Sequence, residues 1–150
     1  MKGSKVTIKN GTIKTSSPEL AILVQNFSDE LILDNVQLSG KMATQYILSN
    51  NFGNVVMKNG TTVKASGGHV AFDAHYGLSS EYDSGVTVTI ADDTVKIIGL
   101  VEYTKQEGKS DEDFLSNTHI YIPVGYELAA PEGYKFQLTE DGSKQELVKA

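Results

Sequence analysis

The sequence predicts an all-β fold of the β-solenoid type, in which short strands stack in successive coils. Two observations predict it. A pattern of apolar residues followed by asparagine recurs along the chain at a nearly constant interval, and a second set of apolar positions recurs in step with it. Short strands separated by turns at a fixed period are typical of solenoids. The 150 residues, 39% of them hydrophobic, are enough for one compact domain.

The first repeat has the pattern apolar-x-apolar-x-Asn-x-x-apolar. Its copies occupy residues 6–13, 31–38, 55–63 and 88–95, and a fifth, degenerate copy is expected at 120–124. The interval between successive starts is almost the same for the first three copies and longer before the fourth. The longer interval contains a polar insert at 77–85, which we interpret as an enlarged loop.

The second repeat predicts the core. Segments 21–27, 46–52 and 70–76 align with one another at nearly the same interval as the first repeat. Because side chains alternate between the two faces of a strand, the aligned apolar residues should share one buried face. We expect a core column of Leu23, Leu48 and Phe72 and an aromatic column of Phe27, Phe52 and Tyr76.

The asparagine of the first three copies is expected to form a turn. These residues are Asn10, Asn35 and Asn59, and Asp92 takes the same place in the fourth copy. A sharp turn between strands needs a left-handed backbone, which asparagine tolerates better than most residues. Stacked asparagine amides also hydrogen-bond from one strand to the next, so we expect a ladder of these side chains.

Two other folds share parts of the pattern. Leucine-rich repeats have a similar period but place asparagine three residues after the second leucine of the strand, one residue later than in this chain. An immunoglobulin-like sandwich also contains many short strands, but it does not repeat the same side chains at a fixed spacing. The solenoid fits best, and the sandwich stays open as the alternative.

The C-terminal segment is expected to form a hairpin. Segments 136–139 and 145–148 flank the sequence Glu140-Asp141-Gly142-Ser143, which contains an Asp-Gly turn. Such a hairpin would cover the open end of the last coil, as a solenoid requires. We therefore divide the chain into coils at 1–125 and a capping segment at 126–150.

The four copies of the first repeat resemble those of right-handed parallel β-helix proteins of the pectin-lyase-like superfamily, particularly repetitive bacterial surface proteins. The tail at 126–136 resembles the ends of some gut-bacterial surface proteins. The resemblance implies a right-handed parallel β-helix of about five coils with a C-terminal β-hairpin cap. It also implies a secreted or cell-surface location. The first residues lack the apolar segment of a signal peptide, which we expect to have been trimmed.

Composition argues against several classes of partner. All 13 basic residues are lysines and the net charge is -6, so the chain should repel nucleic acid and anionic membrane lipids. The absence of cysteine excludes disulfides, thiolate nucleophiles and zinc sites built on cysteine. We expect no cofactor.

Enzymatic activity is the less favoured interpretation. The pectate lyases of the superfamily use an arginine as base and the polygalacturonases use an Arg-Ile-Lys segment, whereas this chain contains no arginine. Neither set of catalytic residues can be transferred to it. The alternative is a fragment of a polysaccharide lyase or glycoside hydrolase, with Asp73, His75, Asp92 or Asp93 as its acidic groups.

One polar patch is a candidate ligand site. Its expected members are Asn26, Ser49, Asn51, Asp73 and His75, which share one strand face by alternation and by the repeat interval. Their amide, hydroxyl, carboxylate and imidazole groups suit recognition of sugar hydroxyls. The plainer explanation is a solvated outer face of the sheet. Two ligands of differing type do not make a metal site, so no metal is expected.

The leading hypothesis is a non-catalytic module of a secreted or surface bacterial protein, acting as an adhesin, a stalk or a weak binder of polysaccharide or host glycan. A structural protein that assembles end to end, of cytoplasmic or phage type, is a third hypothesis. Residues 1–4 are too few to cover Val6, Ile8 and Ile13 of the first repeat. In a longer protein we expect preceding coils to cover them; in this chain alone we expect a second copy to pack against them, forming a homo-oligomer, or a loop to fold over them.

Overall fold

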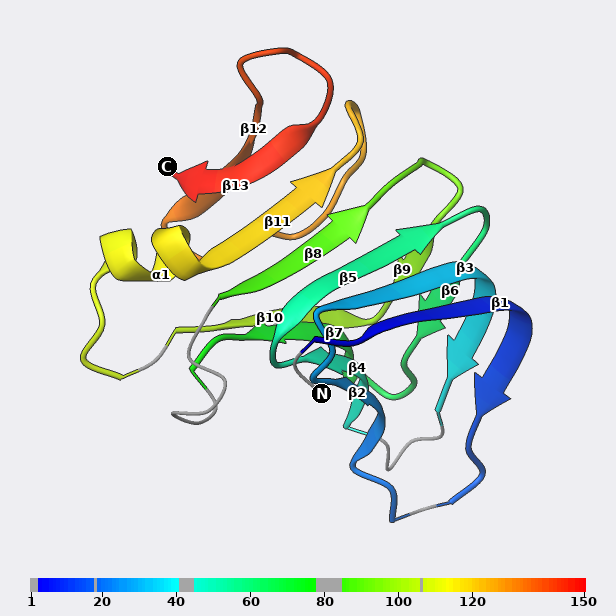
Figure 1. The fold of residues 1–150 in the computed structure, drawn as a ribbon. Helices are drawn as coiled ribbons and strands as arrows, with labels where there is room; N and C mark the ends of the chain where they lie inside the picture. Colours follow the sequence, from blue (N-terminus) through cyan, green and yellow to red (C-terminus); the bar gives the residue numbers. More distant parts are fainter. Residues whose placement is uncertain (1–2, 18, 41–44, 78–84, 106) are drawn as a thin grey trace.

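The computed structural model describes residues 3–17, 19–40, 45–77, 85–105 and 107–150. Within these residues the chain forms two β-sheets and one short helix (Figure 1). That helix, α1 (Asp111–Asn117), is capped at its N-terminus by Ser110, whose side chain accepts a hydrogen bond from the backbone amide of Asp113. In the part of the chain described, no helix is long and apolar enough to cross a membrane.

The larger sheet has nine strands, and the copies of the first repeat lie in it. Its strands are β1 (Lys5–Lys14), β3 (Glu30–Ser39), β5 (Gly53–Lys58), β6 (Thr62–Lys64), β8 (Val86–Ile90), β9 (Lys96–Ile98), β11 (Thr118–Ile122), β12 (Tyr134–Leu138) and β13 (Gln145–Lys149). The strand order is β12-β13-β11-β8-β5-β3-β6-β9, and β1 pairs with β3 beside this path. The pairs among β1, β3, β5, β8 and β11 are all parallel.

The register of these strands is the one the repeat predicts. Val6 lies opposite Leu31, Leu31 opposite Val55, Val55 opposite Val88, and Val88 opposite Ile120. The expected fifth copy is therefore a strand of the same sheet. Figure 1 shows these strands side by side, from the N-terminal strand in blue to the C-terminal hairpin in orange and red.

The smaller sheet has four parallel strands, β2 (Ile22–Asn26), β4 (Tyr46–Asn50), β7 (Val70–His75) and β10 (Leu100–Thr104), in the order β10-β7-β4-β2. Leu48 lies opposite Val24 on one side and Phe72 on the other. The expectation that Leu23 stacks on Leu48 is thus wrong, because the pairing of the first two segments is shifted by one position from their alignment. Ile22, Leu23 and Val24 are all apolar, so alternation could not fix the register.

One core joins the two sheets. Leu33, Val36 and Met57 from the larger sheet and Leu48 and Phe72 from the smaller are at most 1% exposed and belong to one apolar cluster. Phe52 and Tyr76 of the predicted aromatic column are also buried, whereas Leu23 and Phe27 are half-buried. Burial of such side chains is the main favourable contribution to folding.

The predicted asparagine turns are confirmed. Asn10, Asn35 and Asn59 have φ of 54°, 55° and 53°, which is the left-handed region. The Asn35 side-chain amide donates to Asn10 Oδ1 at 3.0 Å, as a ladder requires. The ladder ends there, because the Asn59 amide donates instead to Asp34 Oδ1 at 2.8 Å. The turns at Asn10 and Asn35 lie inside β1 and β3, so each of these strands bends without ending.

The predicted right-handed parallel β-helix, a solenoid of about five coils with a hairpin cap, is wrong. The structure is a helix-poor β fold with several sheets, mixed and parallel, and none of them is closed. The repeats specify which strands pair and in what register, but strand pairing does not require the chain to close into coils. The hairpin of β12 and β13 forms as expected. It extends the larger sheet, because β13 pairs antiparallel with β11.

A cluster around Asp111 attaches the C-terminal hairpin to the rest of the fold. The Asp111 carboxylate contacts Lys105 Nζ and Lys149 Nζ, both at 2.9 Å, and accepts a hydrogen bond from the Tyr134 hydroxyl at 2.5 Å. The hydrogen bond from Tyr134, followed by those from the two lysines, holds the pKa of Asp111 well below its ordinary value. This cluster joins α1, the end of β10 and both strands of the hairpin.

Candidate functional site

A pocket of about 270 Å³ lies against the smaller sheet. Its lining residues are Ile22, Gln25, Tyr46, Ser49, Asn51, Asp73, His75 and Thr104. All four strands of the sheet contribute, and most of the side chains are polar. Ser49 and Asp73 follow Leu48 and Phe72 directly in their strands, so they point to the face opposite these core residues. The pocket is therefore built on the sheet rather than on loops.

Asp73 is the most unusual group in the pocket. The residue is 4% exposed, and its Oδ1 atom is buried and has no hydrogen-bond partner among the described residues. Its Oδ2 atom lies 3.8 Å from His75 Nδ1. Burial raises the pKa of Asp73, and Glu102 adds to this, whereas the Ser49 hydroxyl and His75 act in the opposite direction. A buried carboxylate oxygen without a hydrogen-bond partner destabilises the fold.

A second carboxylate stands beside Asp73 on the next strand. Glu102 of β10 pairs in register with Asp73 of β7, so both side chains leave the sheet on the same face. Glu102 is exposed, and its Oε2 accepts a hydrogen bond from the Tyr46 hydroxyl at 3.1 Å. Burial and the Glu102 carboxylate raise the pKa of Tyr46. The two carboxyl groups therefore have different environments, one buried and one solvated.

The other side of the pocket is an amide chain held by its own hydrogen bonds. Gln25 Nε2 donates to Asn51 Oδ1 at 2.6 Å, and Asn51 Nδ2 donates to Ser49 Oγ at 3.2 Å. Ser49 and Asn51 are 3% and 1% exposed. These contacts fix the orientation of the side chains before any ligand arrives, which lowers the entropy cost of binding.

Four of the five residues of the predicted polar patch line this pocket: Ser49, Asn51, Asp73 and His75. Asn26 does not. It is buried on the other face, where its side-chain amide donates to Asn50 Oδ1 at 3.0 Å and to the Phe52 carbonyl at 2.9 Å. The observed register pairs Gln25 with Ser49 and Asn26 with Asn50, so Gln25 rather than Asn26 faces the pocket.

Sequence reasoning missed Gln25, Tyr46, Glu102 and Thr104. The correct register between β2 and β4 would have identified Gln25. Tyr46 begins the segment that was aligned, but its hydroxyl reaches Glu102, which is distant in sequence, and no sequence signal indicates that contact. The segment 100–104 was not recognised as a copy of the second repeat, so Glu102 and Thr104 could not be placed.

The other acidic candidates, Asp92 and Asp93, lie outside the pocket. Asp92 Oδ2 accepts from the Asn59 backbone amide at 2.8 Å, and Asp92 Oδ1 accepts from the Thr94 amide at 3.0 Å. Burial acts to raise the pKa of Asp92, but these hydrogen bonds and that of the Thr94 hydroxyl lower it below its ordinary value. Asp92 thus stabilises a turn, and Asp93 is exposed.

The residues that the structure describes contain no group of three or more His, Asp or Glu side chains that could hold a metal ion. Comparison with known proteins finds no family model, no curated protein and no solved structure that matches this chain. Nothing in these comparisons identifies a pectin-lyase-like protein, so that resemblance stays an expectation from the sequence.

Proposed function

We propose that the chain is a non-catalytic binding module that takes one sugar residue of a neutral glycan into the pocket of β2, β4, β7 and β10. The observation that carries this proposal is the buried Oδ1 of Asp73, which has no hydrogen-bond partner among the described residues, in a pocket whose other lining is mostly amide and hydroxyl groups. A ligand hydroxyl that donates to this oxygen would offset the cost of leaving it without a partner.

The chemistry of the lining supports a sugar. Sugar hydroxyls both donate and accept hydrogen bonds. The pocket supplies an acceptor in Asp73 and donors in the side-chain amides of Gln25 and Asn51, and Glu102 lies in register beside Asp73 as a further acceptor. The rings of Tyr46 and His75 offer apolar contact. A volume of about 270 Å³ is at the small end of ligand pockets, which suits a single ring. Two neighbouring carboxylates would repel a uronic acid, which favours a neutral sugar.

For the location of this module we keep the expectation from the sequence. We propose a secreted or surface-attached bacterial protein in which the β fold serves as an adhesin or stalk and presents the pocket to polysaccharide or host glycan. Glycan binding can be tested separately from the location, because the pocket belongs to this chain alone.

A glycan array followed by calorimetric titration of the best neutral ligand tests the proposal. We expect Asp73→Ala and Asn51→Ala to weaken binding at least tenfold. The exposed Asp93→Ala is the matched control and should bind as the parent chain does. A thermal midpoint for each variant shows that the fold is intact. An array without neutral hits at high protein concentration, or binding unchanged in Asp73→Ala, would overturn the proposal.

One observation favours a second candidate function, hydrolysis of a glycoside. Glycosidases use two carboxyl groups whose environments separate their pKa values, and Asp73 and Glu102 lie in register on adjacent strands with one buried and one exposed. Incubation with chromogenic glycosides tests this function. Turnover that disappears in both Asp73→Asn and Glu102→Gln would replace the non-catalytic proposal, whereas binding without turnover supports it.

A further inference from the structure

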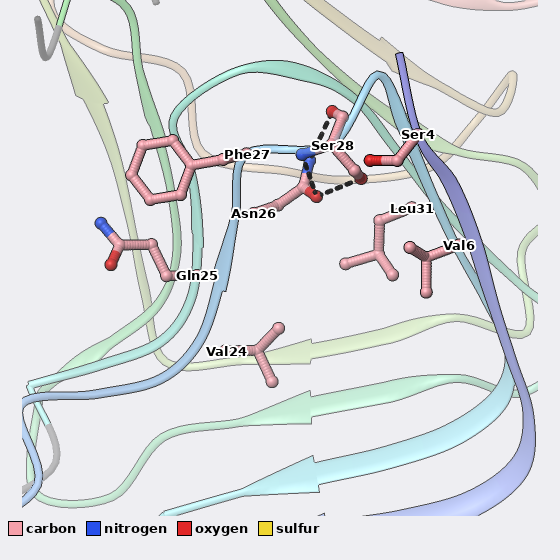
Figure 2. Close-up of a pocket in the computed structure, with 8 residues that line it drawn as sticks. All are labelled: Ser4, Val6, Val24, Gln25, Asn26, Phe27, Ser28 and Leu31. Atoms are coloured by element: carbon pink, nitrogen blue, oxygen red, sulfur yellow. Dashed lines mark hydrogen bonds between the residues drawn. The ribbon is translucent and has the colours of Figure 1, made fainter. Parts of the chain in front are cut away.

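The outer edge of β1 is a second candidate site. Among the described residues β1 pairs with β3 alone, so the amide and carbonyl groups along its other edge are available to another strand. Beside it, β2 is the edge strand of the smaller sheet. Between the two edges lies a mostly apolar cavity of about 430 Å³ whose walls include Val6, Val24 and Leu31 (Figure 2). Val6 is 42% exposed.

The charges along the larger sheet indicate what would fit this edge. Lys9 of β1 lies opposite Asp34 of β3, with Nζ and Oδ2 3.6 Å apart, and Asp34 lies opposite Lys58 of β5. The signs therefore alternate from strand to strand. The Lys9 side chain is 65% exposed. The next strand outward would continue this alternation if it placed an acidic residue opposite Lys9.

The asparagine turn gives a second, independent requirement. Asn10 Oδ1 accepts a hydrogen bond from the side-chain amide of Asn35. No described residue accepts a hydrogen bond from the side-chain amide of Asn10. An incoming strand that bends at the same place with an Asn would present its own Oδ1 to this amide. The fitting partner thus has the pattern apolar-x-apolar-acidic-Asn, which is the pattern of residues 31–35 in β3.

A second copy of this chain does not meet these requirements. The outermost strands of the larger sheet are β1, β9 and β12, and each carries lysine and no acidic residue. Pairing any of them with β1 would bring lysines together, and such lysines protect edge strands from self-association. The β3 of another copy is already paired on both sides. At the edge of the smaller sheet, β10 carries Glu102, but threonine and not asparagine ends that strand. None of the described edge strands of a second copy therefore has the required pattern.

We propose that the edge of β1 binds an extended acidic segment of another protein as a parallel strand, with its apolar side chains in the cavity beside Val6 and its acidic residue opposite Lys9. Main-chain hydrogen bonds to β1 would supply affinity, and the cavity and Lys9 would supply specificity, as in other cases of strand addition. The cavity shares one lining residue, Gln25, with the sugar pocket on the outer face of the smaller sheet, and their other lining residues differ.

A synthetic peptide that copies residues 28–40 is the probe, because it carries the required pattern. Fluorescence anisotropy of the labelled peptide measures binding to the full chain. We expect the Asp34→Lys peptide to bind at least tenfold more weakly, and the chain variant Lys9→Glu to reverse this preference. Amide shifts in β1 on titration, absent from β12, would place the peptide at the proposed edge.

Lys9→Glu changes an exposed side chain, so the variant chain should fold, and its thermal midpoint verifies this. A Val6→Glu chain should lose binding of the acidic peptide as well. No binding of the peptide at millimolar concentration, or binding that ignores both charge exchanges, would overturn the proposal. Concentration-dependent dimers of the unmodified chain through β1 would overturn it too, because a second copy would then be the occupant.

Discussion

The buried carboxyl group of Asp73 destabilises the folded chain, and a bound ligand would offset this loss of stability. Its carboxyl group is buried, its pKa is raised by that burial, and one of its oxygens has no partner among the described residues. Because the folded-state pKa lies above the ordinary 3.8, the folded state binds the proton more tightly than the unfolded state does. The contribution of Asp73 to stability is therefore most favourable at acid pH and is lost as the pH rises through the raised pKa.

Asp73→Asn should accordingly stabilise the chain at neutral pH, because the amide cannot ionise in the buried site. The advantage should shrink as the pH falls towards 3.8, where the carboxyl of the parent chain is protonated as well. Urea unfolding of both chains at several pH values measures the difference. A variant less stable than the parent at neutral pH would show that the ionised carboxylate stabilises the fold.

Individual residues also show what could be read from the sequence. Asn35 was predicted to adopt a left-handed backbone and to hydrogen-bond its neighbour, and it does both. A turn of this kind depends on the conformational preference of one residue, so the residue type is enough to predict it. The partner of the Tyr46 hydroxyl was not predictable, because Glu102 is brought near by the register of strands distant in sequence.

At the level of strands, the repeats predicted pairing better than they predicted architecture. Segments 6–13 and 31–38 both carry asparagine at the fifth position of the repeat, which marks their alignment, and the register there was correct. The apolar run 22–24 does not alternate, and the register was wrong by one position. The helix α1 was not predicted, although Ser110 with Asp113 three positions later is a helix-start signal of the capping-box type.

The observed register of the smaller sheet can be tested by paired substitutions in neighbouring strands. Leu48 is 1% exposed between Val24 and Phe72, so Leu48→Ala should lower the free energy of unfolding by about 2–5 kcal/mol. Leu23→Ala is the matched control, and its half-buried side chain should cost clearly less. Equal losses in chemical denaturation would mean that Leu23 is as much a part of the core as Leu48.

Neither sheet of the described molecule is closed, so each has edge strands that could pair with strands of other chains. An exposed strand edge invites association with another chain, and lysine on the edge is one of the features that prevents it. Lysines lie on all three outermost strands of the larger sheet, although the protein has a net charge of -6. This placement provides a reason against the homo-oligomer that the sequence led us to expect, and in favour of an acidic partner.

The lysines of β1 should therefore keep the chain monomeric. Replacing Lys5, Lys9 and Lys14 together with threonine removes the repulsion while keeping a residue that suits strands. We expect the variant to self-associate in light scattering as its concentration rises, while the parent chain stays monomeric. Replacing Lys64, Lys109 and Lys144, which are exposed and lie outside the outermost strands, with threonine is the charge-matched control and should leave the particle size unchanged. If the β1 variant is folded and stays monomeric, the edge is protected by something other than charge, and the argument from lysine placement fails.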